Sequence, residues 1–592
     1  MHELTINHAD AGYESETNRF DSNFRFSNFD LLDTFLVPYD WGFRVGGAVG
    51  SMCSYNSLNN VSACADRWLL TDMVRSYWGR PDAYVMSDCG AIEDQYEDKK
   101  TAASYADAAA QSVNAGTDWC MGTDFLVHSG LPDAVSQGLL NESQVDAALA
   151  RTLSVRFRLG IFDPAASASA FTTYGAERIN TAASRQAADE AAAMGATLLR
   201  NGESADRSVL PISMADAKLK AVAVVGPHAV TQRDLLGDFY ADAFCPGVNN
   251  KSSRAQDCVP TIGASVVNVL ATSRPDVAVL VAEGVAISGG DFSGAAAALA
   301  AVAAADVVIL AVGYNNADVE REGADHNYTT LPPLQQQLAD AVIAAARARG
   351  VPVVMLLVNA GQIATDTLAA QPDALVEAFY PAFGAPALVR QLFGLENRWG
   401  RLPYTIYEAA FADRIALSDM NVSGAVGRTW RYYSGEPNFR FGDGLSYSSF
   451  SLSCAGGPAT VSSSDPAFSV GVACNSSLSG GAPLGDEILL VVHRAGADVV
   501  KAVGGAHPVP RGTLRDFTRL SGLAAGGAPA PSAFALGPLQ LALTGPLGES
   551  ILYPGTHFVD VSPRAPGTPF TLAVTVTGSA PVVLARPPPM PR

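Results

Sequence analysis

Short apolar segments alternate with helical patterns through most of the chain, and this alternation limits the fold more than any other feature. In the first 160 residues the apolar segments are AVGSMCSYN (48–56), AYVMSD (83–88) and TDW (117–119). The helical patterns around them cover 29–45, 65–79, 101–116, 131–138 and 142–158. Parallel strands need long crossover connections, which are usually helices, so this order predicts parallel strands covered by helices.

A second α/β domain is predicted over 179–412. Its candidate strands are ATLLRN (196–201), KAVAVVG (220–226), VVILAVG (307–313), VPVVMLLVN (351–359) and ALVEAFY (374–380). Helical patterns lie between several of them, at 179–195, 293–305 and 333–349. The segment 161–178 is rich in Ala, Ser and Thr and contains one proline, so it is predicted to link the two α/β regions.

The pattern changes near residue 447, where helical periodicity ends and Gly, Pro and Ser become frequent. Short strand-like runs follow, including FSVGVAC (468–474), EILLVVHRA (487–495) and FTLAVTVTG (570–578). These runs predict an all-β sandwich over 447–585, preceded by a connecting segment at 413–446. The proline-rich end ARPPPMPR (585–592) is predicted to be disordered.

Charge and apolar content narrow the class of protein. The 39 basic and 58 acidic side chains give a net charge of −19, which argues against nucleic acid as a partner. No segment has the roughly 20 uninterrupted apolar residues of a membrane span, so no membrane partner is expected. The balance is typical of a soluble enzyme that acts on neutral carbohydrate, although many unrelated proteins share it.

The cysteines and glycosylation sequons favour an extracellular or cell-wall location. The eight cysteines are sequence neighbours that permit four local disulfides, Cys53/Cys64, Cys89/Cys120, Cys245/Cys258 and Cys454/Cys474. Six N-x-S/T sequons are present, at Asn60, Asn141, Asn250, Asn327, Asn421 and Asn475. The first residues, MHELTINHAD, have neither the basic nor the apolar region of a signal peptide.

Two groups of carboxylates could carry out chemistry. Asp88 closes the strand-like run 83–88, and catalytic side chains of parallel barrels lie at the carboxyl ends of strands. The strand pattern alone allows an equal alternative, in which Asp88 caps a helix or lies in a loop. A second acidic segment contains Asp318, Glu320, Glu322 and Asp325. Its composition alone favours a solvated loop, but a pair of carboxylates is also the machinery of glycoside hydrolysis.

The segment SMCSYNSLNNVSACADRWLLTDMVRSYWGRPDAYVMSDCGAI (51–92) closely resembles glycoside hydrolase family 3, and more narrowly its β-xylosidase and α-L-arabinofuranosidase branch. In that family, S-Y-N and S-D-C elements lie on successive barrel strands, and the Asp of the second element is the nucleophile. The resemblance implies this role for Asp88. Cys89 matches the xylosidase form, where many β-glucosidases have Trp. Tyr55, from S-Y-N, is implied to form part of the −1 sugar subsite; the alternative is core packing with a hydrogen-bonded hydroxyl.

The resemblance continues in order along the chain. VEREGADH (319–326) resembles the loop that carries the acid/base, which implies this role for Glu322, although His326 replaces the Arg of the family pattern. The other matching segments are 188–212, VNAGQ (358–362), WGRLPYTIY (399–407), GRTWRYY (427–433) and FGDGLSY (441–447). The implied multidomain α/β architecture is the C-terminal part of a (β/α)8 barrel (1–160), an α/β sandwich (179–412) and a fibronectin type III-like β-sandwich (447–585).

The resemblance implies a retaining, exo-acting glycosidase that releases terminal β-D-xylose, or α-L-arabinose, from xylan-derived oligosaccharides. Double displacement by two carboxyl groups about 5–5.5 Å apart requires no metal or organic cofactor. The expected partner is therefore an oligosaccharide or polysaccharide substrate. Two alternatives remain open: a β-glucosidase of the same family, and a non-catalytic carbohydrate-binding remnant.

The barrel pattern itself is incomplete. A (β/α)8 barrel takes about 250 residues, whereas about 160 precede the linker and offer three strands. Family members carry five earlier strands and a Lys-His pair; His2 occupies the place of that His, and Arg19 lies in a matching segment downstream. Both are therefore candidate substrate-binding residues. The sequence predicts an N-terminally truncated family member, with activity reduced or lost.

Overall fold

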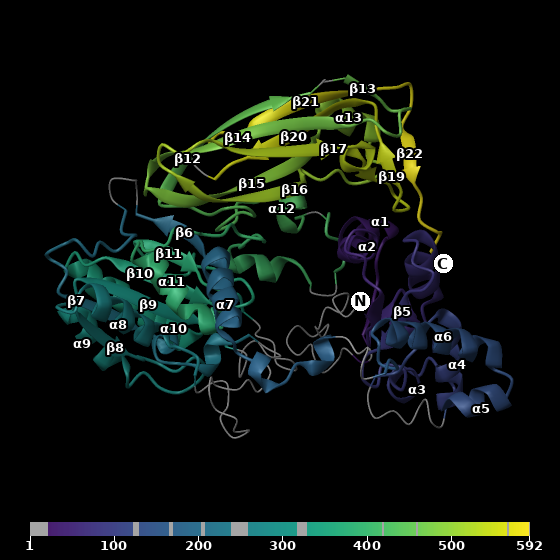
Figure 1. The fold of residues 1–592 in the computed structure, drawn as a ribbon, viewed down its shortest axis with the longest axis horizontal. Coiled ribbons are helices and arrows are strands. Elements are labelled where there is room, and N and C mark those ends of the chain that lie inside the picture. Colours follow the sequence, from purple (N-terminus) through teal and green to yellow (C-terminus); the bar gives the residue numbers. More distant parts are fainter. Residues whose placement is uncertain are drawn as a thin grey trace.

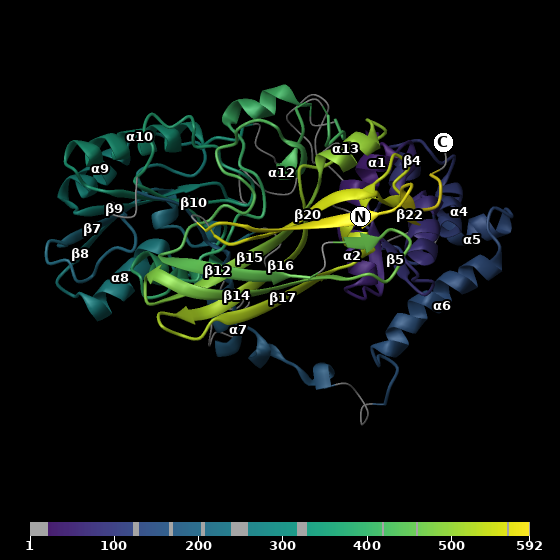
Figure 2. The same ribbon diagram turned by 90° about the horizontal axis from the view of Figure 1, so that it is seen from above.

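The protein consists of three parts, which Figure 1 and Figure 2 show from two sides. The computed structural model describes residues 20, 22–121, 130–164, 170–202, 208–237, 258–315, 328–416, 419–424, 426–457, 460–564 and 567–590. We call 22–164 the N-terminal part, 182–416 the central part and 448–590 the β-rich part. The β-rich part lies across the other two in both views. Within the described ranges, no helix is long and apolar enough to cross a membrane.

Parallel strands form the centre of the N-terminal part. Strand β2 (Gly50–Cys53) pairs in parallel with β5 (Tyr84–Ser87), in a register that joins Cys53 to Ser87. The expected third strand at 117–119 is a single parallel bridge between Met86 and Trp119. A second sheet joins three two-residue strands, β1 (Asn23–Phe24), β3 (Ser57–Leu58) and β4 (Val61–Ser62). The strand order of the sequence analysis is therefore present, with shorter strands than expected.

Helices cover these strands. They are α1 (Asn28–Asp30), α2 (Val37–Arg44), α3 (Asp94–Glu97), α4 (Tyr105–Ala115), α5 (Leu131–Ser136) and α6 (Glu142–Arg158), with two π-helical segments, η3 (Leu31–Phe35) and η5 (Trp68–Tyr77). The expected helix at 29–45 is thus divided into α1, η3 and α2. The buried Asp118 carboxylate accepts hydrogen bonds from Arg75 on η5 (2.7 Å) and Arg151 on α6 (2.8 Å), which fixes both helices to the strand layer.

A six-stranded sheet forms the central part, in the order β6-β11-β10-β9-β7-β8. Its strands are β6 (Thr197–Asn201), β7 (Ala221–Val225), β8 (Ala278–Ala282), β9 (Val307–Gly313), β10 (Val353–Val358) and β11 (Ala374–Glu377). All neighbouring strands are parallel except β6, which runs antiparallel to β11. The apolar runs predicted as strands are β6, β7, β9, β10 and β11, whereas β8 was missed.

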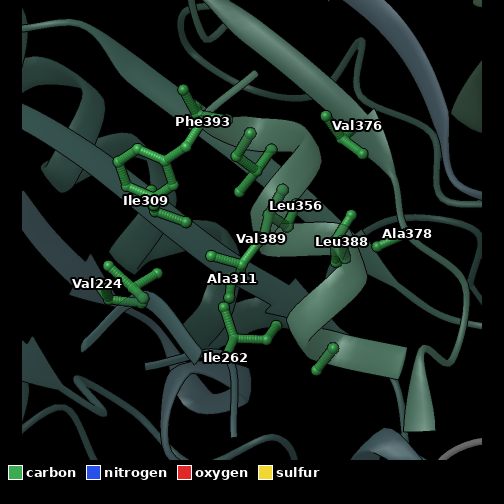
Figure 3. Close-up of a cluster of buried hydrophobic side chains, with 14 of the residues drawn as sticks. Val224, Ile262, Ile309, Ala311, Leu356, Val376, Ala378, Leu388, Val389 and Phe393 are labelled. Carbon is green, nitrogen blue, oxygen red and sulfur yellow. The ribbon is translucent and has the colours of Figure 1, made fainter. Parts of the chain in front are cut away.

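Helices pack on both faces of this sheet because its strands are buried on both sides. They are α7 (Ala182–Gly195), α8 (Ile262–Ser273), α9 (Ala295–Ala304), α10 (Pro333–Ala348) and α11 (Ala385–Leu392). One apolar cluster joins alternate strand residues, such as Val224 and Ile309, to α8 and α11 (Figure 3). A second cluster joins the intervening residues to α9 and α10. Near-continuous apolar strands of this kind are expected in a parallel sheet with two covered faces.

Two antiparallel sheets form most of the β-rich part. One has the order β12-β14-β17 and the other β13-β21-β20-β15-β16, with one parallel pair between β13 and β21. The strands are β12 (Ser448–Gly456), β13 (Thr460–Ser462), β14 (Val470–Gly481), β15 (Leu484–Ala495), β16 (Thr513–Ala524), β17 (Ala530–Leu536), β20 (Gly555–Ser562) and β21 (Phe570–Thr577). Apolar side chains of the two sheets form one core between them.

A third, small sheet lies at one end of the β-rich part. It joins β18 (Leu543–Thr544), β19 (Ser550–Leu552) and β22 (Val582–Ala585). Short helices α13 (Ala497–Val503) and α14 (Pro538–Leu541) pack nearby, and α12 (Thr429–Tyr432) lies in the segment that precedes the β-rich part.

Buried arginines join the central part to the β-rich part. The Arg564 guanidinium is 3% exposed and donates to the backbone carbonyls of Trp399 and Gly400, the latter at 2.6 Å. From the opposite side, Arg401 donates to the backbone carbonyls of Ile488 (2.8 Å) and Ser562 (3.0 Å). These bonds hold the two parts through their main chains.

A buried carboxylate joins the N-terminal part to the rest. Asp33 on η3 accepts hydrogen bonds from Arg431 (2.7 and 3.0 Å), from the Tyr432 hydroxyl (2.7 Å) and from the Thr544 hydroxyl (2.8 Å). Three regions that are distant in sequence therefore meet at one side chain.

Two of the four disulfides that the sequence permits are present in the described part of the chain, Cys53–Cys64 and Cys454–Cys474, whereas Cys89 and Cys120 are present as thiols. Cys258 is also disulfide-bonded, and Cys245 lies outside the described residues. The prediction of a disordered proline-rich end is wrong for residues 586–590, which follow β22 and contact the N-terminal part. Met590 packs against the apolar cluster of that part.

Candidate active site

Asp88 lies directly after β5, at the edge where the carboxyl ends of the parallel strands meet. Its backbone N–H donates to the Cys53 carbonyl at the end of β2 (2.9 Å), which continues the strand pairing by one residue. Val85 packs into the apolar cluster with η5, so the alternation of a strand places Met86 and Asp88 on the opposite face. The structure thus places Asp88 at the strand end that the sequence predicted.

The Asp88 carboxylate is half-buried and is fixed by its own loop. Oδ1 accepts a hydrogen bond from the Cys89 backbone N–H at 2.7 Å. The next helix, α3, has Glu93 as its N-cap residue, so the alternative in which Asp88 caps a helix is wrong. A carboxylate that is held at a strand end and still partly open to solvent has the geometry of a nucleophile or a general base.

The S-Y-N residues continue β2 at the same edge. Tyr55 is 6% exposed and its ring packs edge-to-face on Phe20, with centroids 4.8 Å apart. Asn56 is fully buried, and its Oδ1 accepts from the Ser54 hydroxyl at 2.6 Å. For the Asn56 Nδ2 donor, the structure shows no hydrogen-bond partner within the described part of the chain. Buried donors are usually paired, so this amide is a candidate site residue that the sequence analysis did not single out.

Another titratable group lies at the start of α3, the helix that follows Asp88. Asp94 begins α3 and is largely buried, and its Oδ2 lies 4.0 Å from the buried Lys99 ammonium. Burial is the largest influence and raises the pKa of Asp94 to about 7, against the opposing effect of Lys99. Shifts of this kind concentrate at functional sites, although structural ion pairs show them too. In the sequence, the signal for Asp94 is an acidic residue at the start of a buried helix.

The second acidic segment emerges from the central sheet. Residues 316–327, including Glu322, Asp318, Glu320, Asp325 and His326, lie outside the described residues. The residues on either side are well fixed. Asn315 follows β9 and donates to Asp234 (2.9 Å), and the Tyr314 hydroxyl donates to the Thr330 carbonyl (2.6 Å).

These flanking residues lie beside the switch point of the central sheet. In the order β6-β11-β10-β9-β7-β8, the chain turns from β7 to β8 on one side and then to β9 on the other. Open parallel sheets bind ligands beside the carboxyl ends of strands at such a switch point. Strand β9 ends at this place, followed by Tyr314 and Asn315, the last described residues before 316–327.

Of the five site residues predicted from sequence, the structure describes Asp88 and Tyr55 and brings them to one strand edge. Glu322, His2 and Arg19 lie outside the described residues. Within the described ranges, no group of three or more His, Cys, Asp or Glu side chains is arranged to hold a metal ion.

Comparison with known proteins identifies the family. The Glycosyl hydrolase family 3 N terminal domain matches residues 8–155, and the Glycosyl hydrolase family 3 C-terminal domain matches 196–447. A probable exo-1,4-beta-xylosidase, bxlB, of Aspergillus fumigatus is 31% identical over 96% of this chain and 71% of its own length. Beta-D-xylosidase 1 of Arabidopsis thaliana is 32% identical over 74% of this chain, and the match covers 53% of that relative's length.

Solved structures give the same result. A GH3 exo-beta-xylosidase (XlnD), solved in complex with a xylobiose aziridine activity based probe, superimposes with a TM-score of 0.80. It is 25% identical, and the match covers 98% of this chain and 72% of that one. A beta-glucosidase from Listeria innocua, in complex with glucose, has a TM-score of 0.76 at 25% identity over 97% of this chain and 72% of its own. The chain therefore belongs to glycosyl hydrolase family 3.

Proposed function

We propose that this chain is a retaining exo-glycosidase that releases terminal β-D-xylose, or α-L-arabinose, from xylan-derived oligosaccharides. The observation that carries the proposal is the position of Asp88, half-buried at the carboxyl end of β5 beside the end of β2. The xylosidases among the relatives support the choice of sugar.

Asp88 is the nucleophile of the proposed reaction. One carboxylate oxygen attacks the anomeric carbon, the bond to the leaving oxygen breaks, and a covalent glycosyl ester forms. The hydrogen bond from the Cys89 backbone N–H to Oδ1 fixes the orientation of the Asp88 carboxylate at the strand end.

Glu322 is the proposed acid/base, because VEREGADH (319–326) resembles the loop that carries this residue in the family. Glu322 gives its proton to the leaving oxygen in the first step and removes a proton from water in the second. The switch point at β7 and β9, where its segment begins, supports this assignment, because ligands of open parallel sheets bind there. Retention requires the two carboxyl groups to come within about 5–5.5 Å of each other.

Further assignments belong to the same proposal. The parallel strands β2 and β5 and the bridge at Trp119 would form part of a (β/α)8 barrel (1–160), followed by an α/β sandwich (179–412) and a fibronectin type III-like domain (447–585). Tyr55, His2 and Arg19 would contact the sugar in the −1 subsite. The disulfides support an extracellular or cell-wall location.

The test combines turnover with covalent labelling. The purified chain is assayed on nitrophenyl β-xyloside, α-arabinofuranoside and β-glucoside, and is separately incubated with a xylobiose aziridine probe. We expect highest turnover on the β-xyloside and a label on the peptide that contains Asp88. Asp88→Ala should abolish both, whereas Asp82→Ala, at an exposed acid before β5, should leave both unchanged.

Each other outcome has a definite meaning. Preference for the β-glucoside would favour the β-glucosidase alternative, which the likeness to the Listeria innocua enzyme keeps open. A folded chain that binds xylo-oligosaccharide without turnover or labelling would make the chain a carbohydrate-binding protein. A label on another carboxylate would refute the assignment of Asp88.

A further inference from the structure

The last residues of the chain form a proline-rich segment that contacts the N-terminal part. Pro587, Pro588 and Pro589 precede Met590, and Arg586 precedes the first proline. Proline fixes its own φ near −65° and restricts the preceding residue to extended backbone, so four consecutive residues are held close to a polyproline II conformation. Such a segment loses little conformational entropy when it binds.

The segment lies against a tryptophan of the N-terminal part. The Trp68 indole Nε1–H donates to the Pro588 carbonyl at 2.9 Å, across 520 positions of sequence. Trp68 is only 3% exposed, and Pro587 is buried as well. Domains that recognise proline-rich peptides bind them through aromatic side chains, and Trp68 is an aromatic side chain that donates directly to this proline-rich segment.

An asparagine holds the end of the segment. Asn59 and Asn60 both have positive φ (49° and 75°) in the two-residue turn between β3 and β4, the backbone of a type I′ turn. The Asn59 side chain bonds to both backbone groups of Phe26, and its Nδ2 also lies 3.1 Å from the Met590 sulfur. Met590 itself packs against the apolar cluster of the N-terminal part.

The start of the segment is held by the β-rich part. It follows directly on β22, which pairs with β19. The Arg586 guanidinium lies 3.8 Å from the carboxylate of Glu549, which is largely buried. The segment is therefore attached to the β-rich part at one end and to the N-terminal part at the other, as Figure 1 shows at the C-terminus.

We propose that Arg586–Met590 is an intramolecular proline-rich ligand and that Asn59, Trp68 and the apolar cluster under Met590, together called the tail site, are its receptor. Occupancy of the tail site holds the N-terminal part against the β-rich part. Because the ligand is tethered beside its receptor, weak contacts suffice: a tether of a few residues gives an effective concentration on the order of millimolar.

The experiment compares hydrogen exchange in four full-length proteins. In one, residues 586–592 are replaced by a Gly/Ser sequence of equal length. In the second, Trp68→Phe removes the indole donor and keeps an aromatic ring. Trp41→Phe, at a side chain that is 53% exposed, is the matched control for the second, and wild type is the reference. Exchange is followed by mass spectrometry in the peptide that spans residues 57–70.

Replacement of the tail should speed exchange in residues 57–70 on the order of tenfold, because a hydrogen bond and buried apolar contacts are lost. Trp68→Phe should speed it less, and Trp41→Phe not at all. The synthetic peptide ARPPPMPR, at millimolar concentration, should restore slow exchange to the tail-replaced protein and have no effect on wild type.

Three results would overturn the proposal. Unchanged exchange after tail replacement would mean that the tail rests on the surface without holding it. Equal binding of the peptide to wild type and to the tail-replaced protein would mean that the tail does not occupy the tail site. If tail replacement prevents folding, the Trp68→Phe variant tests the proposal instead. Equal exchange rates in the Trp68→Phe and Trp41→Phe variants would then refute it. None of these measurements depends on glycosidase activity.

Discussion

The Asp33 carboxylate offers the most direct test of how the three parts are held together, and the change we consider is Asp33→Asn. Oδ2 accepts from Arg431 Nη1 (2.7 Å) and the Tyr432 hydroxyl (2.7 Å), and Oδ1 accepts from Arg431 Nη2 (3.0 Å) and the Thr544 hydroxyl (2.8 Å). Each oxygen therefore faces a guanidinium donor. An asparagine amide must turn its NH2 toward one of these donors in either orientation, so the variant loses two hydrogen bonds and the negative charge.

The cost follows from the burial of this group. The Asp33 side chain is 4% exposed and Arg431 16%, and removal of one partner from a buried ion pair typically costs about 3–5 kcal/mol. Burial, and after it the Arg431 charge, lower the pKa of Arg515 to about 10, whereas the Asp33 charge acts in the opposite direction. We therefore expect the variant to be less stable by about 3–5 kcal/mol at neutral pH.

Hydrogen exchange measures this effect at the junction itself. A loss of about 3–5 kcal/mol should raise exchange rates of the peptides around η3 and α12 by roughly two to three and a half orders of magnitude. Glu436→Gln is the control, because Glu436 pairs with Arg440 at 2.5 Å but is 85% exposed. Its expected effect is about 0–1 kcal/mol.

Acid provides a second check. Burial raises the pKa of Asp33, but the Arg431 charge and the hydrogen bonds outweigh it and the net pKa is lowered. A lowered pKa means that the stabilisation is present above the unfolded value near 3.8 and is lost as the pH falls through the folded value. The difference between wild type and variant should therefore shrink in acid. A loss below about 1 kcal/mol at pH 7, equal to the control, would refute the reasoning.

Three further predictions concern other parts of the structure. Burial lowers the pKa of His493 and His557, so both stay neutral in the folded protein. Their contribution to the free energy of unfolding should be complete above about pH 6.5 and fall by up to about 1.4 kcal/mol per pH unit for each histidine below it. Urea titrations from pH 7.5 to 5 measure this dependence. Gly548 has φ +84°, and a Cβ there would lie 2.0 Å from Leu32 Cδ1, so Gly548→Val should cost about 1–3 kcal/mol in thermal unfolding. The exposed Cys89 thiol should react with a thiol reagent in the native protein.

Matched measurements make these three predictions refutable. The double replacement of His493 and His557 by Gln should flatten the pH dependence, and an unchanged slope would contradict the histidine assignment. Leu32→Ala should relieve part of the cost of Gly548→Val, and an additive loss would mean that the two do not meet. An unreactive Cys89 in folded protein would favour the disulfide with Cys120 over the two thiols.

The central sheet was largely predictable, and its misses have physical causes. Strands such as β9 and β10 are continuous apolar runs, which a sheet covered on both faces requires. Helix α8 reads IGASVVNVLATS, in which β-branched residues favour a strand, so its pattern gave no helical signal. Strand β8 lies at the sheet edge with partly exposed residues, and α11 has only eight residues, too few for a clear period.

The position of Asp88 was predictable because it depends on local sequence. An apolar run of strand length that ends in an acid places that acid at a strand end, and the structure confirms this. The chemistry required a family resemblance in addition, since spacing gives no distance between Asp88 and Glu322. That distance is set by how the parts are joined, and the joining residues are remote in sequence.

Contacts between distant residues were beyond the sequence pattern. Asp33 and Arg431 are 398 positions apart, and nothing in either segment indicates the other. The proline-rich tail was predicted to be disordered because prolines exclude regular structure. Composition shows that such a segment forms neither helix nor central strand, but it does not show whether a tryptophan elsewhere will bind it.

The way in which Arg564 contacts the central part has a consequence for divergence and recombination. Its guanidinium donates to main-chain oxygens, including those of Trp399 and Gly400, which every amino acid provides. Substitutions at the accepting positions can therefore accumulate while the bonds persist, provided that the backbone keeps its course. Arginine alone carries this many donors in one plane. Substitution is therefore restricted at Arg564 in the β-rich part and permitted at the accepting positions in the central part. A chimera that exchanged the central part for that of a distant relative would keep this attachment without any compensating mutation.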